Sequence, residues 1–376
     1  MRILQISSAP TFGGGEKHVC DLAAGLAGLG HEISLAVRPG CGWKDKIRGV
    51  EPANIHEVPL RGSADIGSAF RLASLTREHE FDILHAHMAR DYVPAAIASR
   101  RAGVPVVLTR HVLFPMSGIN KLLLRNVGRV IAVSSAVEAN LQAIFEKEKI
   151  FAVTNGIAME KFGNVSGEDA SAFRDVYGID SGVKLVTSVG ELKALKGQED
   201  FILAASEIAK VRPDAHFLVV GRDNSPGRAF RKKLRRMVRV LDLEGRFTFL
   251  EWVEDTAPML AATDVFVSAS HSESFGLAIL EAMASGRPVV ATRTAGALEL
   301  IEDGVSGLLA GVKEPLEISK AVVDILDDGD QAHQLGTAAR SRAADNFSLA
   351  KMVASTESVY EELARPEAGS TAKLRT

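Results

Sequence analysis

Two carboxylates stand around one short apolar stretch near residue 280. Glu273 lies in a run of small and polar residues, and Glu281 is the only charged residue between Gly276 and Ser285. The apolar residues around Glu281 recur at helical spacing, which predicts a helix packed on a sheet. An unpaired ionised carboxylate there would be costly, so we expect Glu281 to accept hydrogen bonds from hydroxyl or amide donors. Glu273 would lie beside it, although an ordinary surface acid is the alternative interpretation.

Two carboxylates at a helix N-terminus indicate a particular class of ligand. Carboxylates accept hydrogen bonds from hydroxyl groups, and the backbone amides of a helix N-terminus bind anions. A sugar linked to a diphosphate offers both hydroxyls and an anion. The segment therefore predicts a site for such a compound.

A glycine run follows the first expected strand. Gly13, Gly14 and Gly15 lead into an expected helix and would let backbone amides approach an anion closely. The run is not a dinucleotide fingerprint, because His18 occupies the third glycine position and Arg38 stands where the ribose-binding acid would be. The alternative is a plain tight turn between strand and helix.

A second loop, residues 190–197, follows the first strand of the second half. Lys196 lies where we expect a helix to begin, and a cation at that position favours diphosphate binding. A surface lysine is the alternative interpretation. Glu191 argues against a diphosphate site in this loop, because a negative charge repels a diphosphate.

His111 is the most suggestive of the ten histidines. It ends an expected strand, where an imidazole could bond a substrate hydroxyl. His85 and His87 share one face of the neighbouring strand and suggest a metal pair. Because no third ligand with suitable spacing follows, we interpret them as structural and expect no bound metal or other cofactor.

Short apolar runs alternate with amphipathic stretches along most of the chain, which predicts an α/β protein with parallel sheets and crossover helices. We expect strands at 3–7, 32–37, 55–58, 83–86, 106–109, 130–133, 185–189, 216–220, 246–250, 264–267 and 289–291. The clearest helices are expected at 16–29, 314–327, 331–346 and 349–363.

The length of 376 residues predicts two domains of roughly 150–200 residues each. We expect an N-terminal Rossmann-like domain at 1–165, a second at 166–346, a helix at 347–364 packing back on the first domain, and a disordered tail at 365–376. Two doubly wound domains would face each other across a cleft at the carboxyl ends of their strands, where open α/β sheets bind ligands. The three loops above follow such strand ends.

Composition limits the class of protein. The chain is 46% hydrophobic and 24% charged, and its net charge of −3 argues against general nucleic-acid binding. Two cysteines fit a reducing compartment. The sequence enters a strand at once, which leaves no room for a signal peptide, and no apolar run reaches about 18 residues. We therefore expect a cytoplasmic protein.

One basic region suggests a membrane surface. Residues 90–129 carry seven Lys or Arg and a single acid, Asp91, with apolar residues at 113–116 and 122–124. Basic and apolar side chains together suit an anionic inner membrane face or a lipid-phosphate acceptor. Packing in the core would explain the leucines equally well.

The segment from 264 to 309 resembles the donor-binding signature of the family 4 (group 1) retaining glycosyltransferases, which have the GT-B fold. The resemblance rests on residues 273–277 (ESFGL), 281–291 (EAMASGRPVVA) and 303–309 (DGVSGLL), with 13–16 (GGGE), 132–134 (AVS) and 155–156 (NG) at matching places. It covers nearly the whole chain. The family usually has Arg where this chain has Glu191.

The resemblance implies roles for individual residues. Glu281 would hold the ribose hydroxyls of a nucleoside-diphosphate sugar, Glu273 would contact the sugar, and His111 would lie over it. The remaining donor-binding residues would contact the diphosphate: Gly14, Gly15, Lys193, Lys196, Phe275, Gly276 and Leu277. Transfer in this family is retaining and needs no metal, and closure of the two domains would complete the site.

Together these features predict a glycosyltransferase. It would move a sugar from a UDP- or GDP-type donor to a sugar or lipid-linked acceptor, in cell-envelope polysaccharide or lipopolysaccharide biosynthesis. A nucleotide-sugar epimerase or hydrolase of the same fold is one alternative. A sugar-nucleotide-binding protein without catalysis is another, because Glu191 lies beside the expected diphosphate.

Overall fold

The computed structural model describes residues 1–364, so the tail expected at 365–376 lies outside the described residues. The chain divides into two compact units. Unit 1 consists of residues 1–156 together with the last helix, which begins at Leu349, and unit 2 is Ile157–Ser348.

Unit 1 is built on a seven-stranded sheet in which all strands run parallel. Their order runs outwards from β1, with β2 and β3 added on one side and β4 to β7 on the other, as in a doubly wound Rossmann sheet. From one edge to the other the strands are β3 (Ile55–Glu57), β2 (Glu32–Val37), β1 (Arg2–Ser7), β4 (Ile83–Ala86), β5 (Val106–Arg110), β6 (Arg129–Ala132) and β7 (Ile150–Ala152).

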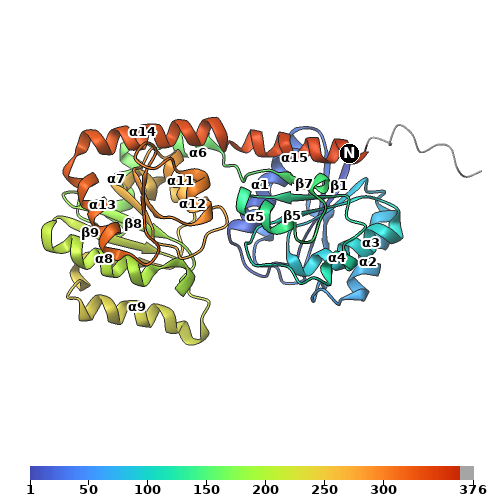
Figure 1. Ribbon diagram of the computed structural model, residues 1–376, viewed down its shortest axis with the longest axis horizontal. Helices are drawn as coiled ribbons and strands as arrows, with labels where there is room; N and C mark the ends of the chain where they lie inside the picture. The colour runs from blue at the N-terminus through green and yellow to red at the C-terminus, as the bar shows by residue number, and fades with distance from the viewer. Residues whose placement is uncertain (365–376) are drawn as a thin grey trace, which may run out of the picture. The chain divides into compact units, whose positions relative to one another are not determined.

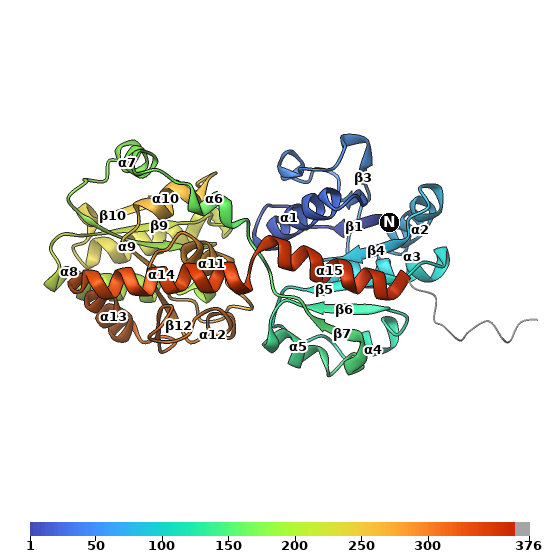
Figure 2. The same ribbon diagram turned by 90° about the horizontal axis from the view of Figure 1, so that it is seen from above.

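The last helix of the chain packs in the core of unit 1. α15 (Leu349–Ala364) lies beside α1 (Gly14–Gly28), and both contribute to one hydrophobic cluster with strands β1 and β2 (Figure 2). The two helices approach closely at Gly25, where a Cβ atom would lie 2.4 Å from a methyl group of Val353. The other helices of unit 1 are α2 (Ile66–Glu78), α3 (Tyr92–Ala102), α4 (Asn120–Leu123) and α5 (Ser135–Leu141).

Unit 2 repeats this architecture with six parallel strands (Figure 1). In sheet order they are β10 (Phe247–Leu250), β9 (Ala215–Val220), β8 (Lys184–Val189), β11 (Val265–Ser268), β12 (Val289–Thr292) and β13 (Leu308–Ala310). The helices are α6 (Met159–Gly163), α7 (Gly167–Val176), α8 (Gln198–Val211), α9 (Ala229–Val240), α10 (Thr256–Ala262), α11 (Leu277–Ala284), α12 (Ala295–Leu300), α13 (Pro315–Asp327) and α14 (Gly329–Asn346).

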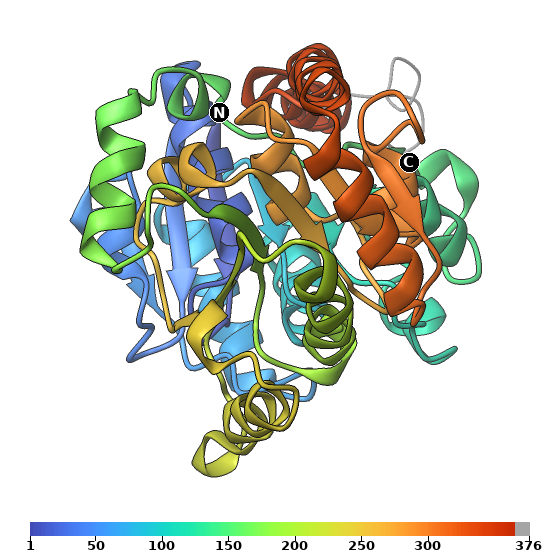
Figure 3. The same cartoon turned by 90° about the vertical axis from the view of Figure 1, so that its left-hand side faces the viewer.

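Helices cover both faces of the unit 2 sheet (Figure 3). α8, α9 and α13 share a hydrophobic cluster with one face, while α11 packs against α14 on the other (Figure 1). This arrangement explains why the strands read as continuous apolar runs, since both faces are buried.

The predicted α/β class and the doubly wound topology are confirmed, and each expected strand is present within about one residue at either end. The structure adds the edge strands β7 and β13, which are only three residues long and gave no periodic signal. The units meet at Gly156 and Ile157, earlier in the chain than the boundary expected at residue 165. The reason is α6, whose buried Phe162 belongs to unit 2.

No helix among residues 1–364 is long and apolar enough to cross a membrane.

Tyr360 of α15 links several buried polar groups of unit 1. Its hydroxyl accepts a hydrogen bond from Nε2 of Gln5 at 3.1 Å and lies 2.5 Å from Nδ1 of His85. The other ring nitrogen of His85 lies 2.7 Å from Oγ1 of Thr109. All four side chains are fully buried, so each depends on the others for its hydrogen bonds.

Replacing Tyr360 with phenylalanine removes only this hydroxyl. We expect Tyr360→Phe to lower the free energy of unfolding of unit 1 by about 1–3 kcal/mol, because it leaves Gln5 and His85 buried without their partner. Trp43 is fully buried in unit 1, so its fluorescence during urea unfolding, in a Trp252→Phe background, reports on this unit. Tyr177→Phe in unit 2 is the control, and an equal effect of both variants would contradict the expectation.

Candidate functional site

The loops that follow β8, β11 and β12 in unit 2 pack backbone against backbone. Gly197 has a φ of +64°, and a Cβ atom there would lie 1.8 Å from the carbonyl oxygen of Ala269. A Cβ atom at Gly296 would lie 2.3 Å from the carbonyl oxygen of Phe275. Glycine is therefore required at both positions, and it brings the three loops into direct contact.

Backbone hydrogen bonds fix the same loops. The amide of His271, after β11, donates to the carbonyl of Leu195 at 2.8 Å, and the amide of Gly296 donates to the carbonyl of Glu273 at 2.9 Å. Each loop is thus held to its neighbour by main-chain contacts, which do not depend on long flexible side chains.

Lys196 and Glu273 form an ion pair across two of these loops. Lys196 ends a short 3₁₀ turn, Ala194–Lys196, directly before α8, and Glu273 lies in the loop before α11. Their side chains are 24% and 16% exposed, so the pair is partly shielded from water but remains reachable. The structure therefore brings together a cation and an acid that the sequence separates by 77 residues.

Glu281 is buried in α11, as expected from its apolar surroundings. The expected hydroxyl donor is Thr256, whose Oγ1 donates to Oε2 of Glu281 at 3.2 Å. A carboxylate has about four acceptor positions, so Glu281 can accept hydrogen bonds from more than one donor.

α11 begins at Leu277, after Gly276 in the left-handed region (φ +101°). The preceding residue, Phe275, is buried and packs its ring on Phe347 at 5.8 Å between centroids. This anchor fixes where the amides of residues 275–277 point. The first amides of a helix have no partner within the helix and carry partial positive charge.

Lys193 lies in the same loop as Lys196 but is paired differently. Its Nζ lies 2.5 Å from Oε2 of Glu191, and Asn224 donates to the other oxygen of Glu191 at 2.9 Å. Burial alone would raise the pKa of Glu191, but the hydrogen bonds from Lys193 and Asn224 outweigh it and lower that pKa. Glu191 is therefore ionised at neutral pH, with its charge met by Lys193.

The sequence analysis assigned no role to His271, Asp200 or Thr256. Nε2 of His271 lies 2.5 Å from Oδ2 of Asp200 in the first turn of α8, which ties the β11 loop to that helix. The available sequence signal for a role of His271 was its position in the loop after an expected strand. Thr256 had none, because it lies at the start of a separate helix.

In unit 1 the glycine run forms the start of α1. Gly13 is the residue before the helix, and Gly14 and Gly15 lie in its first turn. A Cβ atom at Gly15 would meet nothing within 4 Å, so packing within this chain does not require glycine there.

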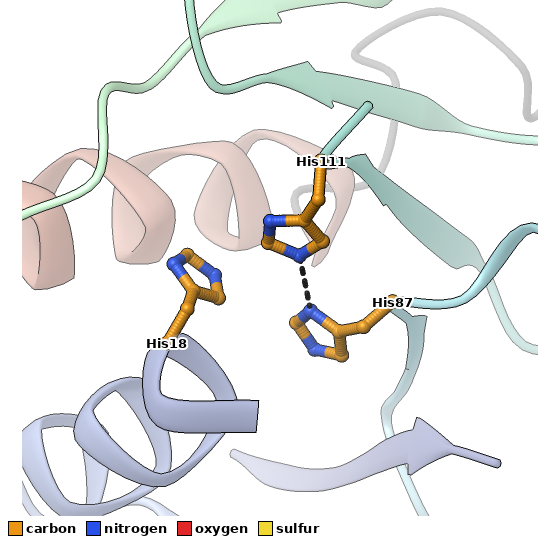
Figure 4. Close-up of side chains that lie close together, drawn as sticks. All are labelled: His18, His87 and His111. Carbon is orange, nitrogen blue, oxygen red and sulfur yellow. Dashed lines mark hydrogen bonds between the residues drawn. The ribbon is translucent and has the colours of Figure 1, made fainter. Parts of the chain in front are cut away.

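Three histidines of unit 1 come together at the carboxyl ends of β4 and β5 (Figure 4). His87 follows β4, His111 follows β5, and His18 lies on α1. One ring nitrogen from each lies within 4.8 Å of the others, and Nε2 of His111 is 3.5 Å from Nδ1 of His87. We call these three side chains the histidine cluster.

Sequence spacing offered no third ligand beside the strand histidines, and the structure places two further histidines near His87. His85 is held in the chain of hydrogen bonds around Tyr360, whereas His87 joins His111 and His18. Sequence spacing could not show this, because His18 belongs to a helix from a distant part of the chain.

Burial is the main influence on the histidine cluster. It lowers the pKa of His18 to about 4, against a smaller rise caused by the nearby Asn155, and the charge of Lys17 adds a still smaller lowering. Burial, together with the neighbouring imidazoles, also lowers the pKa of His87 and of His111 well below the usual value. All three rings are therefore neutral at pH 7.

Two family models match the chain. The model described as "Glycosyltransferase Family 4" matches residues 12–161, and the model "Glycosyl transferases group 1" matches residues 169–342. The first lies almost wholly in unit 1 and the second in unit 2. Together they cover most of the described chain.

Individual proteins agree with this match. N-acetyl-alpha-D-glucosaminyl L-malate synthase of Bacillus anthracis is 28% identical over 383 residues, covering 96% of this chain and 97% of the relative. The lipopolysaccharide core biosynthesis glycosyltransferase LpsE of Rhizobium meliloti (strain 1021) is 26% identical, covering 89% and 92%. The crystal structure of Anabaena Alr3699/HepE in complex with UDP and glucose is similar with a TM-score of 0.87 and 25% identity, covering 96% of this chain and all of that one.

The sheet topology, the loops at the carboxyl ends of the strands and these matches define a glycosyltransferase of the GT-B fold. The chain belongs to the family 4, group 1 glycosyltransferases.

The close approach at Gly296 can be tested by adding one methyl group. We expect Gly296→Ala to lower the free energy of unfolding of unit 2 by about 1–3 kcal/mol, because the Cβ atom forces the backbone of Phe275 away. The fluorescence of Trp252 during urea unfolding, in a Trp43→Phe background, measures this effect. Gly245→Ala is the matched control, since a Cβ atom there meets nothing within 4 Å. Equal stability of the two variants would contradict the required close contact.

Proposed function

We propose that this glycosyltransferase moves a sugar from a UDP- or GDP-type nucleoside-diphosphate sugar to a sugar or lipid-linked acceptor, with retention of configuration and without a metal. The acceptor would belong to cell-envelope polysaccharide or lipopolysaccharide biosynthesis. The reaction would take place in the cytoplasm, at or near the inner face of the membrane.

The observation that carries the proposal is the group of residues around the start of α11. Lys196 is paired with Glu273, the amides of residues 275–277 lie at the start of the helix, and the buried Glu281 lies further along it. This group offers a cation and amides to a diphosphate and two carboxylates to hydroxyl groups. A nucleoside-diphosphate sugar has both parts.

The roles of the individual residues are those that the family resemblance implies. Lys196 and the amides of α11 stabilise the charge that develops on the leaving diphosphate, which supplies the electrostatic part of catalysis. Glu281 holds the ribose hydroxyls, while Glu273 contacts the sugar and positions Lys196. Gly14 and Gly15 leave the backbone at the start of α1 accessible to a phosphate, and open space at Gly15 supports this role. His111 lies over the sugar, and Lys193 offsets the charge of Glu191 beside the diphosphate.

The relatives support a UDP-type donor, but their names indicate different acceptors. The similar Anabaena protein was crystallised with UDP and glucose. The Bacillus relative is named as a synthase of a glucosaminyl malate, and the Rhizobium relative is named for lipopolysaccharide core biosynthesis. We therefore favour UDP among the candidate bases, and the Rhizobium relative favours an envelope acceptor.

A donor panel tests the proposal directly. The full-length protein is incubated with UDP-, GDP-, ADP- and CMP-sugars in the presence of EDTA, and products are identified by mass spectrometry. We expect slow release of one nucleotide together with the free sugar. An isomerised nucleotide sugar would favour the epimerase, and binding without turnover in the presence of cell-envelope acceptors would favour a non-catalytic binding protein.

Glu281 is the residue whose loss should be most damaging. We expect Glu281→Ala to abolish measurable nucleotide release, a loss of at least about 100-fold in kcat/KM, because the ribose hydroxyls lose a charged acceptor. The variant should stay folded by circular dichroism. Glu160→Ala, an exposed acid in α6 of the same unit, is the control. Unchanged turnover in Glu281→Ala would remove the assignment of the donor site.

We propose contact with an anionic membrane through residues 112–125 of unit 1. This segment exposes Phe114 (67%), Ile119 (62%) and Leu122 (63%), and it also carries the exposed basic residues Lys121 and Arg125. The alternative interpretation, that the leucines pack in the core, holds for Leu124 but not for Leu122. Exposed apolar residues beside cations suit the surface of an anionic bilayer.

Vesicle sedimentation tests this contact. We expect the double variant Phe114→Ser, Leu122→Ser to bind vesicles containing phosphatidylglycerol at least about tenfold more weakly, since two apolar side chains lose their burial. Val176→Ser, which changes an exposed apolar residue of unit 2, is the control. Binding equal to that of the control, or no binding by the unmodified protein, would contradict the membrane contact.

A further inference from the structure

The histidine cluster has the spacing of a metal site. Two imidazole nitrogens bound at about 2.0–2.1 Å to one tetrahedral ion lie about 3.4 Å apart. Nε2 of His111 and Nδ1 of His87 are 3.5 Å apart, and a nitrogen of His18 lies within 4.8 Å of both. The rings converge from three different elements, α1 and the ends of β4 and β5 (Figure 4).

Hydrogen bonds outside the cluster fix the ring of His87. The amide nitrogen of Gln5 donates to Tyr360, so its Oε1 faces Nε2 of His87 at 2.6 Å and accepts a hydrogen bond from it. The proton of His87 is therefore on Nε2, and the lone pair of Nδ1 points toward His111. A histidine that donates one N–H to an oxygen while the other nitrogen is free is typical of metal ligands.

His18 supplies the independent observation. It is 4% exposed, and neither of its ring nitrogens meets the geometry of a hydrogen bond with a protein group; nor does Oδ1 of nearby Asn155. A buried polar side chain without a partner is rare and costly. Asn155 is close enough to raise the pKa of His18 but does not meet hydrogen-bond geometry, and a bound ion would give the imidazole a partner at bonding distance.

We propose that, in the protein without a donor sugar, His18, His87 and His111 bind one divalent transition-metal ion, with Zn²⁺ as the representative, and leave a fourth position open to water. A metal-bound His111 could not also contact the sugar as proposed above, so the ion and the donor exclude each other and the transfer itself stays free of metal. Nε2 of His111 now carries the proton that faces His87; on binding, this proton moves to Nδ1 and the ion takes its place. His111 is the partly buried member of the cluster, so the ion would enter on its side.

The ligand set selects among metals. Imidazole nitrogen suits Zn²⁺, Cu²⁺, Ni²⁺ and Co²⁺, whereas Mg²⁺ and Ca²⁺ require oxygen ligands, which the cluster lacks. The neighbouring cations Lys17 and Arg110 oppose binding, but Lys17 is paired with Asp21 at 2.7 Å. Three neutral imidazoles hold a divalent ion without a counter-charge in carbonic-anhydrase-type sites.

Cobalt substitution tests the site without reference to activity. The full-length protein, free of any affinity tag and stripped with a chelator, is titrated with Co²⁺ in the absence of nucleotide sugar. We expect one Co²⁺ per chain with the intense visible absorption of four-coordinate cobalt, and displacement by one equivalent of Zn²⁺.

Variants identify the ligands. His111→Gln and His18→Gln should each abolish the absorption band and weaken Zn²⁺ binding by at least about 100-fold. His79→Gln is the control, because His79 and His56 form a second close pair in unit 1, with ring centroids 4.7 Å apart. Cys41→Ser tests whether the free thiol of Cys41 takes part in binding.

His111→Gln keeps the test decisive even if replacing the buried His18 disturbs folding. A weak, octahedral cobalt spectrum in the unmodified protein would overturn the proposal. So would a band that survives His111→Gln in a folded variant, or one that disappears in His79→Gln or Cys41→Ser.

Discussion

Direct backbone contact between loops is the constraint on which the candidate donor site depends. Gly197 and Gly296 leave no room for a Cβ atom against Ala269 and Phe275, so the loops after β8, β11 and β12 have one mutual arrangement. That arrangement places Lys196 beside Glu273 and sets the start of α11. Groups that stabilise a developing charge are effective when they are held in place before the reaction, and a rigid backbone holds them without further cost in entropy.

Unit 1 positions its polar groups in a different way. Its central side chains are buried and depend on a chain of hydrogen bonds that begins at Tyr360 of the last helix and passes through Gln5 to His87. A helix from the far end of the sequence therefore fixes the ring of a histidine at the carboxyl edge of the sheet. This explains why α15 belongs to unit 1, where its apolar face also packs against α1.

Features that depend on neighbouring residues in the sequence, such as buried strands and the burial of a helix face, were the most predictable. Strands buried on both faces read as apolar runs, and the burial of Glu281 in an apolar helix required a hydroxyl donor, which proved to be Thr256. Contacts between distant segments were not predictable. The Lys196–Glu273 pair and the approach of His18 to His87 depend on how strand ends line up in the folded sheets.

Hydrogen exchange with and without UDP tests most directly whether the loops of unit 2 hold a nucleoside diphosphate. Backbone amides that bind the diphosphate exchange more slowly in the complex. We predict that saturating UDP protects peptides spanning residues 190–198 and 273–281, while peptides from the basic helix α9 (Ala229–Val240) keep their rates. Protection of α9 alone, or of no peptide in unit 2, would contradict the donor site.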